Sequence, residues 1–81
     1  MRIRVFVTPR EGILDPQGRA VEDALHSLGF NGISDVRIGR YIVLELDASS
    51  RTAAEPIVAQ MCQQLLANPT IEDYRFEVEP V

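Results

Sequence analysis

The residues of this chain that could do chemistry are few, and they do not form a reactive set. His26 is the only histidine and Cys62 the only cysteine among 81 residues. Catalysis by histidine needs an oriented partner, and a nucleophilic thiol needs a cationic neighbour. Neither partner is visible at helical spacing. We therefore interpret His26 as a structural or surface residue and Cys62 as a packing residue.

Carboxylates and glycines give no stronger signal. Glu22-Asp23 and Glu72-Asp73 are sequence neighbours, which do not share a helix or strand face and so make poor acid/base pairs. The five glycines are scattered and form neither GxGxxG nor a P-loop. The chain also has no CxxC metal motif. We predict no catalytic, cofactor-binding or metal-binding residue on this chain.

Composition indicates a small soluble protein, a single domain over residues 1–81. Apolar residues make up 46% and charged residues 25%, as in ordinary globular chains. The net charge of −4 repels phosphate backbones and disfavours nucleic-acid binding. No apolar run approaches the ~20 residues that span a bilayer. With one cysteine and no signal peptide, we expect a cytoplasmic protein, and its small core favours self-association.

Hydrophobic periodicity predicts the elements that position these residues. Alternation of apolar and polar residues predicts strands at 2–8, 36–38, 42–46 and 73–79. Glycine followed by arginine between the second and third strands predicts a tight hairpin with Gly39 and Arg40 at its tip.

Two amphipathic stretches predict helices. Asp15 caps the first, which Pro16 opens and Gly29 ends. Ser49 or Ser50 can cap the second. Because proline is poorly tolerated inside a helix, Pro56 predicts either a late start near Glu55 or a kinked first turn.

The resulting order, β-α-β-β-α-β, predicts an α+β ferredoxin-like fold. Right-handed crossovers would give a four-stranded antiparallel sheet with both helices on one face. Strand parity places Phe6, Tyr41 and Val43 on the other face, among arginines and glutamates. Such a face is either wet or an interface. The aromatic residues could stack RNA bases, but the acidic balance argues against this.

Three segments together resemble one family. Residues 14–25 carry LDPQG, residues 35–42 carry VRxG, and residues 61–74 carry LLANP. At these spacings they resemble the PurS subunit of phosphoribosylformylglycinamidine synthase, and the similarity covers nearly the whole chain.

The resemblance implies a role in the fourth step of de novo purine synthesis. The assembled ligase would combine a large synthetase subunit, which holds ATP and magnesium, with a glutaminase subunit that releases ammonia. A PurS-like chain would carry no catalytic residue or cofactor, would bring these two partners together, and would form a homodimer or higher oligomer. An alternative is a regulatory module of the same topology that binds a small molecule.

From these patterns we predict three regions of subunit contact: the loop before and into the first helix, the hairpin tip, and the open sheet face. The predicted contact residues are Phe6, Leu14, Asp15, Pro16, Gly18, Gly39, Arg40, Tyr41 and Val43.

Overall fold

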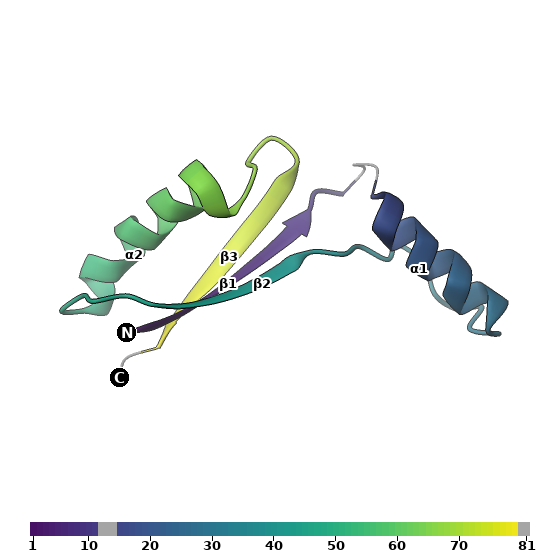
Figure 1. Ribbon diagram of the computed structural model, residues 1–81, viewed down its shortest axis with the longest axis horizontal. Coiled ribbons are helices and arrows are strands. Elements are labelled where there is room, and N and C mark those ends of the chain that lie inside the picture. Colours follow the sequence, from purple (N-terminus) through teal and green to yellow (C-terminus); the bar gives the residue numbers. More distant parts are fainter. Residues whose placement is uncertain (12–14, 80–81) are drawn as a thin grey trace.

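A computed structural model of the chain describes residues 1–11 and 15–79. In chain order the elements are β1 (Arg2–Pro9), α1 (Pro16–Ser27), β2 (Arg40–Glu45), α2 (Arg51–Met61), a one-turn π-helix η1 (Cys62–Leu66) and β3 (Glu72–Glu79). The three strands form one sheet in the order β2-β1-β3, with β1 antiparallel to both neighbours (Figure 1). The predicted α+β class is confirmed.

The core lies between this sheet and α2. Ile3, Val5 and Val7 alternate along the central strand and are fully buried. They face a stripe on α2 and η1 whose spacing of four keeps its members on one side of the helix. The members of this stripe are Ala54, Val58 and Cys62. We call the sheet, α2 and η1 the body of the molecule.

The second helix begins at Arg51. Ser50 is its N-cap, and the Ser50 Oγ accepts a hydrogen bond from the Ala53 amide at 3.2 Å. Of the two alternatives that Pro56 left open, the late start near Glu55 is therefore wrong. Pro56 lies inside the helix, where its missing N–H removes one backbone hydrogen bond on an exposed side.

Residues 15–39, which we call the arm, extend away from the body. Figure 1 shows α1 beyond the end of the sheet, whereas α2 lies along it. The radius of gyration is 15.9 Å, compared with about 12 Å for a compact chain of this length. The principal extents of 50 × 26 × 14 Å describe the same elongation. The prediction that both helices cover one sheet face is therefore wrong for the single chain.

The predicted hairpin at Gly39 and Arg40 is also absent. Residues 36–38 form no strand, so the described residues contain three strands, not four, and the chain runs extended from the arm directly into β2 (Figure 1). The physical reason is one of register. A two-residue turn at 39–40 would place Ile38 opposite Tyr41, and residues directly opposite each other share a sheet face. Tyr41, however, lies on the face turned away from the core.

Within residues 1–11 and 15–79, no helix is both long enough and apolar enough to cross a bilayer.

Candidate functional site

The sheet face opposite α2 carries a three-layer stack of side chains. Phe6 of β1 lies opposite Tyr41 of β2, with ring centroids 5.1 Å apart and planes inclined by 30°. The guanidinium of Arg75, from β3, lies 3.9 Å above the Phe6 ring centroid. A cation over an aromatic face and an offset ring pair are both attractive. The stack therefore joins all three strands on their exposed side.

Ion pairs surround this stack. Arg2 pairs with Glu45 at 3.1 Å, and Arg75 with Glu77 at 3.8 Å. Arg4 pairs with Glu79. Exposed pairs of this kind contribute about 0–1 kcal/mol each, so their main effect is to balance the charge of the face.

The apolar centre of this face is open to solvent. Tyr41 is 57% and Val43 50% exposed. A hollow of ≈ 170 Å³ adjoins the stack and is lined by Phe6, Thr8, Asp73, Tyr74 and Arg75. Aromatic and arginine side chains inside a polar rim are typical of protein interfaces. The structure thus brings Phe6, Tyr41 and Val43 together on one surface, as predicted from strand parity.

The place of Arg75 above Phe6 was not predicted. Strand alternation put Arg75 on this face, but only the register between β1 and β3 sets it directly opposite Phe6. That register depends on long-range pairing, which the local pattern does not encode.

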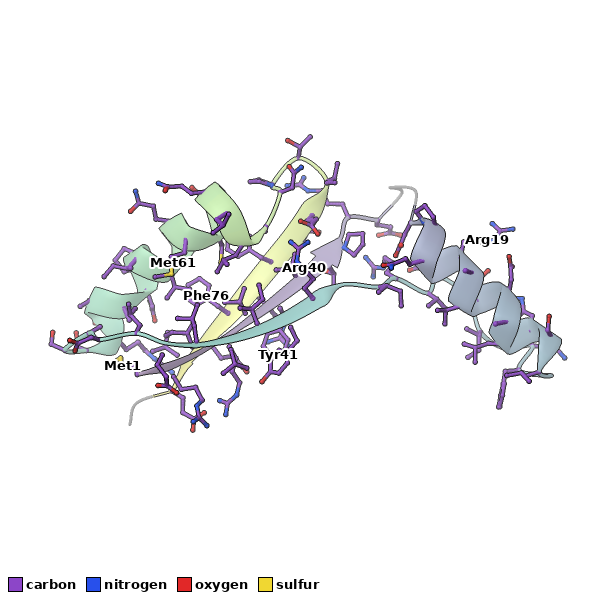
Figure 2. All side chains as sticks on the ribbon, in the orientation of Figure 1. Met1, Arg19, Arg40, Tyr41, Met61 and Phe76 are labelled. Atoms are coloured by element: carbon purple, nitrogen blue, oxygen red, sulfur yellow. The ribbon has the colours of Figure 1, made fainter. Side chains whose placement is uncertain are left out.

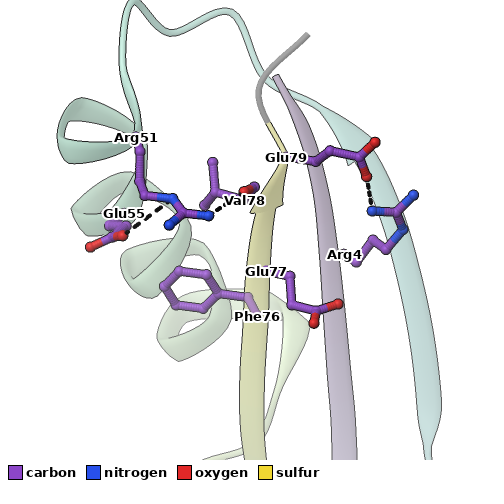
Figure 3. A pocket seen from close by; sticks show the side chains of 7 residues that line it. All are labelled: Arg4, Arg51, Glu55, Phe76, Glu77, Val78 and Glu79. Carbon is purple, nitrogen blue, oxygen red and sulfur yellow. Dashed lines mark hydrogen bonds and ion pairs between the residues drawn. The ribbon is translucent and has the colours of Figure 1, made fainter.

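A second hollow, of ≈ 550 Å³, wraps around the free edge of β3 (Figure 3). Arg51 and Glu55 of α2 line it on one side of the strand, and Arg4 and Glu79 line it on the other. The Arg51 Nη2 donates to the Val78 carbonyl at 2.8 Å. This contact satisfies an acceptor of the edge strand, which discourages pairing with another strand there.

Arg40 makes contacts within the chain rather than projecting freely from a hairpin tip. Its Nη2 donates to the Leu66 carbonyl at 2.7 Å and to the Glu72 Oε1 at 3.0 Å. The same Glu72 oxygen accepts from the Asn68 amide at 2.8 Å. Arg40, labelled in Figure 2, therefore ties the start of β2 to the end of η1 and the start of β3. Its predicted contact with another subunit stays a prediction.

The remaining predicted residues lie where the arm begins. Pro16 opens α1, and Asp15 caps it by accepting from the Gly18 amide at 3.0 Å. The other Asp15 oxygen accepts from the Ile38 amide at 2.8 Å. These backbone donors, Ile38 first and then Gly18, lower the pKa of the Asp15 carboxyl. Leu14 lies outside the described residues.

The two side chains that could react, Cys62 and His26, lie in surroundings that favour packing and hydrogen bonding over catalysis. Cys62 is fully buried, and burial raises the pKa of its thiol, which disfavours the nucleophilic thiolate. The His26 Nε2 lies 2.8 Å from the carbonyl oxygen of Ile33. Glu22, Asp23 and His26 approach within 4.8 Å of one another, a consequence of helical spacing that sequence reasoning overlooked. Solvated acidic clusters of this kind are common on helix surfaces.

The fold and this site describe a small α+β protein with an exposed aromatic and arginine face on its sheet. The sequence profile of the family described as PurS, phosphoribosylformylglycinamidine (FGAM) synthase, matches residues 2–80. The chain belongs to the PurS family of phosphoribosylformylglycinamidine synthase subunits, as its three motifs predicted.

Individual relatives agree with this assignment. The PurS subunit of phosphoribosylformylglycinamidine synthase from Bacillus subtilis is 50% identical over 80 residues, covering 99% of this chain and 94% of that protein. A crystal form of B. subtilis PurS superposes with a TM-score of 0.85, at 49% identity, over 98% of each chain. A chain in the structure of PurLQS from Thermotoga maritima has a TM-score of 0.83, at 30% identity, over 94% of this chain and 93% of that one.

Proposed function

We propose that this chain is the small, non-catalytic subunit that assembles the ligase. It holds a large synthetase subunit and a glutaminase subunit together so that ammonia passes from one to the other. ATP and magnesium are held by the large subunit, and this chain carries no cofactor. The assembly works in the cytoplasm.

The observation that carries the scaffold role is the open sheet face built around Phe6, Tyr41 and Arg75. Its aromatic and arginine centre, inside a rim of balanced charges, has the composition of an interface core. Ammonia transfer between two active sites depends on positioning and on excluding water, so a docking subunit contributes to rate without reacting. The T. maritima relative, whose structure is that of PurLQS, supports this role.

Self-association is part of the same proposal. The arm exposes large apolar side chains to solvent, among them Leu28 at 74% and Phe30 at 56%. An exposed apolar set of this kind marks a protein interaction site. A ferredoxin-like sheet also needs a fourth strand beside β2, and a second copy can supply it.

The test is glutamine-dependent ADP formation from formylglycinamide ribonucleotide and ATP. The large and glutaminase subunits from the same genome are assayed with and without this chain. We expect activity only when the chain is present. Equal activity without it would overturn the proposal, as would saturable stabilisation of the isolated chain by a small ligand such as glutamine together with no effect on the ligase.

A matched pair of variants tests the docking face. Tyr41→Ala removes an exposed member of the stack, and we expect the concentration of this chain needed for half-maximal activity to rise about 10–30-fold, as for an interface hot spot of ~2 kcal/mol. Arg19→Ala removes an exposed side chain on α1, away from this face, and should leave that concentration unchanged. Equal behaviour of the two variants would exclude this face as the docking surface.

A further inference from the structure

We propose that Asn31 is a modification site, at which the backbone nitrogen of Gly32 attacks the Asn31 side chain and converts it, by deamidation, mainly to isoaspartate. The reaction is intramolecular and needs only water. It changes the covalent structure of the arm, and it does not depend on the proposed function.

Asn31 and Gly32 form an exposed turn after α1. All residues from Gly29 to Asp35 are exposed, and the turn lies at the end of the arm that points away from the sheet (Figure 1). A Cβ built on Gly32 would meet nothing within 4 Å. Water and solvent base therefore reach both residues, and no neighbouring side chain restricts their movement.

The two reacting groups are free of hydrogen bonds. The Asn31 backbone amide donates to the Gly29 carbonyl at 3.1 Å, which sets the turn. Among residues 1–11 and 15–79, however, no hydrogen bond involves the Gly32 amide or the side chain of Asn31. Glycine also has no Cβ, so its backbone can rotate until its nitrogen approaches the Asn31 Cγ. Nucleophile and electrophile are thus adjacent, unpaired and mobile.

The reaction consumes one water and releases one ammonia. The Gly32 nitrogen loses its proton to solvent base and bonds to the Asn31 Cγ, and the side-chain nitrogen takes up a proton and leaves as ammonia. Water then opens the cyclic imide at either of its two carbonyls. Opening at the backbone carbonyl routes the main chain through Cγ and gives isoaspartate, whereas opening at Cγ gives aspartate. Either product adds one negative charge to a chain whose net charge is −4.

The other side-chain amides that might react lack a free nucleophile. Asn68 is the only other asparagine, and it precedes Pro69, which has no N–H. Gln17 precedes Gly18, whose amide already donates to a carboxylate at 3.0 Å, and a glutamine would have to close a larger ring. We therefore expect the reaction at Asn31 alone.

The product should disturb the end of the arm. Isoaspartate at position 31 lengthens the main chain by one carbon atom, two residues before Ile33. The Ile33 carbonyl oxygen lies 2.8 Å from the His26 Nε2, so this contact depends on the path of the turn between them. We expect the contact to be lost, which frees the end of α1 from the segment that follows it.

Incubation of the full wild-type chain at mildly alkaline pH tests the reaction. Peptide mapping by mass spectrometry follows the replacement of the amide by a carboxylate, and methylation by a purified isoaspartyl methyltransferase measures the isoaspartate. The rate should rise with pH, because the attacking nitrogen must lose its proton. We expect it to lie within about tenfold of the rate in a synthetic peptide of residues 28–35, since an unprotected turn opens at almost no free-energy cost. A larger difference would show that the fold protects Asn31 and would overturn the proposal.

Gly32→Ala tests the identity of the nucleophile. Its Cβ has free space in the fold, but the added methyl group hinders the approach of the nitrogen, and we expect the reaction to slow roughly tenfold. Ser34→Ala, an exposed neighbour in the same segment, is the control and should keep the wild-type rate. Equal rates in Gly32→Ala and wild type would overturn the attack by the backbone nitrogen.

The single histidine reports the consequence for the arm. In a chain that has been converted at Asn31, the NMR signals of the His26 ring should shift toward those of a free histidine. In Asn31→Ser, which has no amide to lose, they should stay unchanged over the same incubation. Unchanged signals in the converted chain would overturn the loss of the Ile33 contact. Both measurements use the chain without the other subunits, so their outcome is separate from that of the ligase assay.

Discussion

The body and the arm are stabilised by different interactions. The body buries apolar side chains from β1, β3, α2 and η1. Among the residues that the structure describes, all eight buried hydrophobic residues lie in the body or, for Ala67, directly after it. The arm buries only Gly18 among its described residues and is held by polar contacts of Asp15 and His26. Apolar burial is the main source of folding free energy. Burial of apolar side chains therefore stabilises the body, whereas the arm leaves its large apolar side chains exposed.

The same difference separates the two faces of the sheet. The inner face is apolar around Val5, whose neighbours across the sheet are Ile42 and Phe76. The outer face carries arginines, glutamates and stacked rings around Phe6. Interior packing tolerates little change in volume or polarity, whereas exposed side chains on a surface tolerate much larger changes. Substitutions placed in pairs, one in each region, show whether this division is real.

The largest effect is expected from a charge placed in the body. Val5→Asp buries a carboxylate that has no partner on the central strand, which costs several kcal/mol, of the order of the whole stability of a small domain. We expect a chain without a cooperative melt by circular dichroism. Val43→Asp, two positions along β2 from Tyr41 and half-exposed, should melt within a few degrees of wild type. Similar melts for the two variants would contradict the assignment of inner and outer faces.

The difference between the two faces could be predicted from the sequence. Alternation along a strand decides which of its side chains share a face, whatever the order of the strands in the sheet. The core strands, the cap at Asp15, a cap at Ser49 or Ser50, and the outer cluster of Phe6, Tyr41 and Val43 all followed from local patterns. The position of α1 did not follow. The sequence of a helix with an apolar stripe shows that the stripe is to be buried, but not on which surface. Burial on the chain's own sheet or on another protein would give the same pattern.

The hairpin shows the same limit more sharply. Glycine followed by arginine between two apolar runs indicates a turn, but an extended crossing at Gly39 uses the same residue for its lack of a side chain. The alternation of side chains along the strands already argued against the turn, because a turn at 39–40 would pair Ile38 with Tyr41 and so place both side chains on the same face of the sheet. The role of Arg40 was missed for a related reason: its acceptors, Leu66 and Glu72, lie 26 and 32 positions away along the chain.

A methyl group where α1 contacts Val36, in the extended segment that leads into β2, should disturb the arm and spare the body. In Gly18→Ala the new Cβ would lie 2.1 Å from a backbone oxygen of Val36, so α1 must move away at a cost of roughly 1–3 kcal/mol. Hydrogen exchange should show protection of the Ile38 amide falling about 10–100-fold. Gly32→Ala, whose Cβ would have nothing within 4 Å, is the control. Unchanged protection in Gly18→Ala would mean that the contact does not stabilise the arm.

Within the body, two arginines that look alike on the surface should differ. Arg40→Ala removes hydrogen bonds to the Leu66 carbonyl and to Glu72, and a half-exposed site of this kind is worth about 1 kcal/mol. Arg2→Ala removes one exposed ion pair with Glu45 and should cost less than about 0.5 kcal/mol. Urea midpoints at fixed protein concentration measure both. Equal midpoints would mean that Arg40 acts as an ordinary surface charge.

The smallest effect concerns the acid sensitivity of the arm. Because the folded pKa of Asp15 is lowered, its contribution to stability is full above the ordinary aspartate pKa of about 3.9. It is lost as the pH falls through the folded value. Between pH 7 and pH 3, wild type should therefore lose more thermal stability than Asp15→Asn, which keeps a capping oxygen but cannot titrate. Asp23→Asn, an exposed carboxylate on the same helix, should follow wild type. If Asp15→Asn also followed wild type, the carboxylate would not be the group that joins α1 to the extended segment around Ile38.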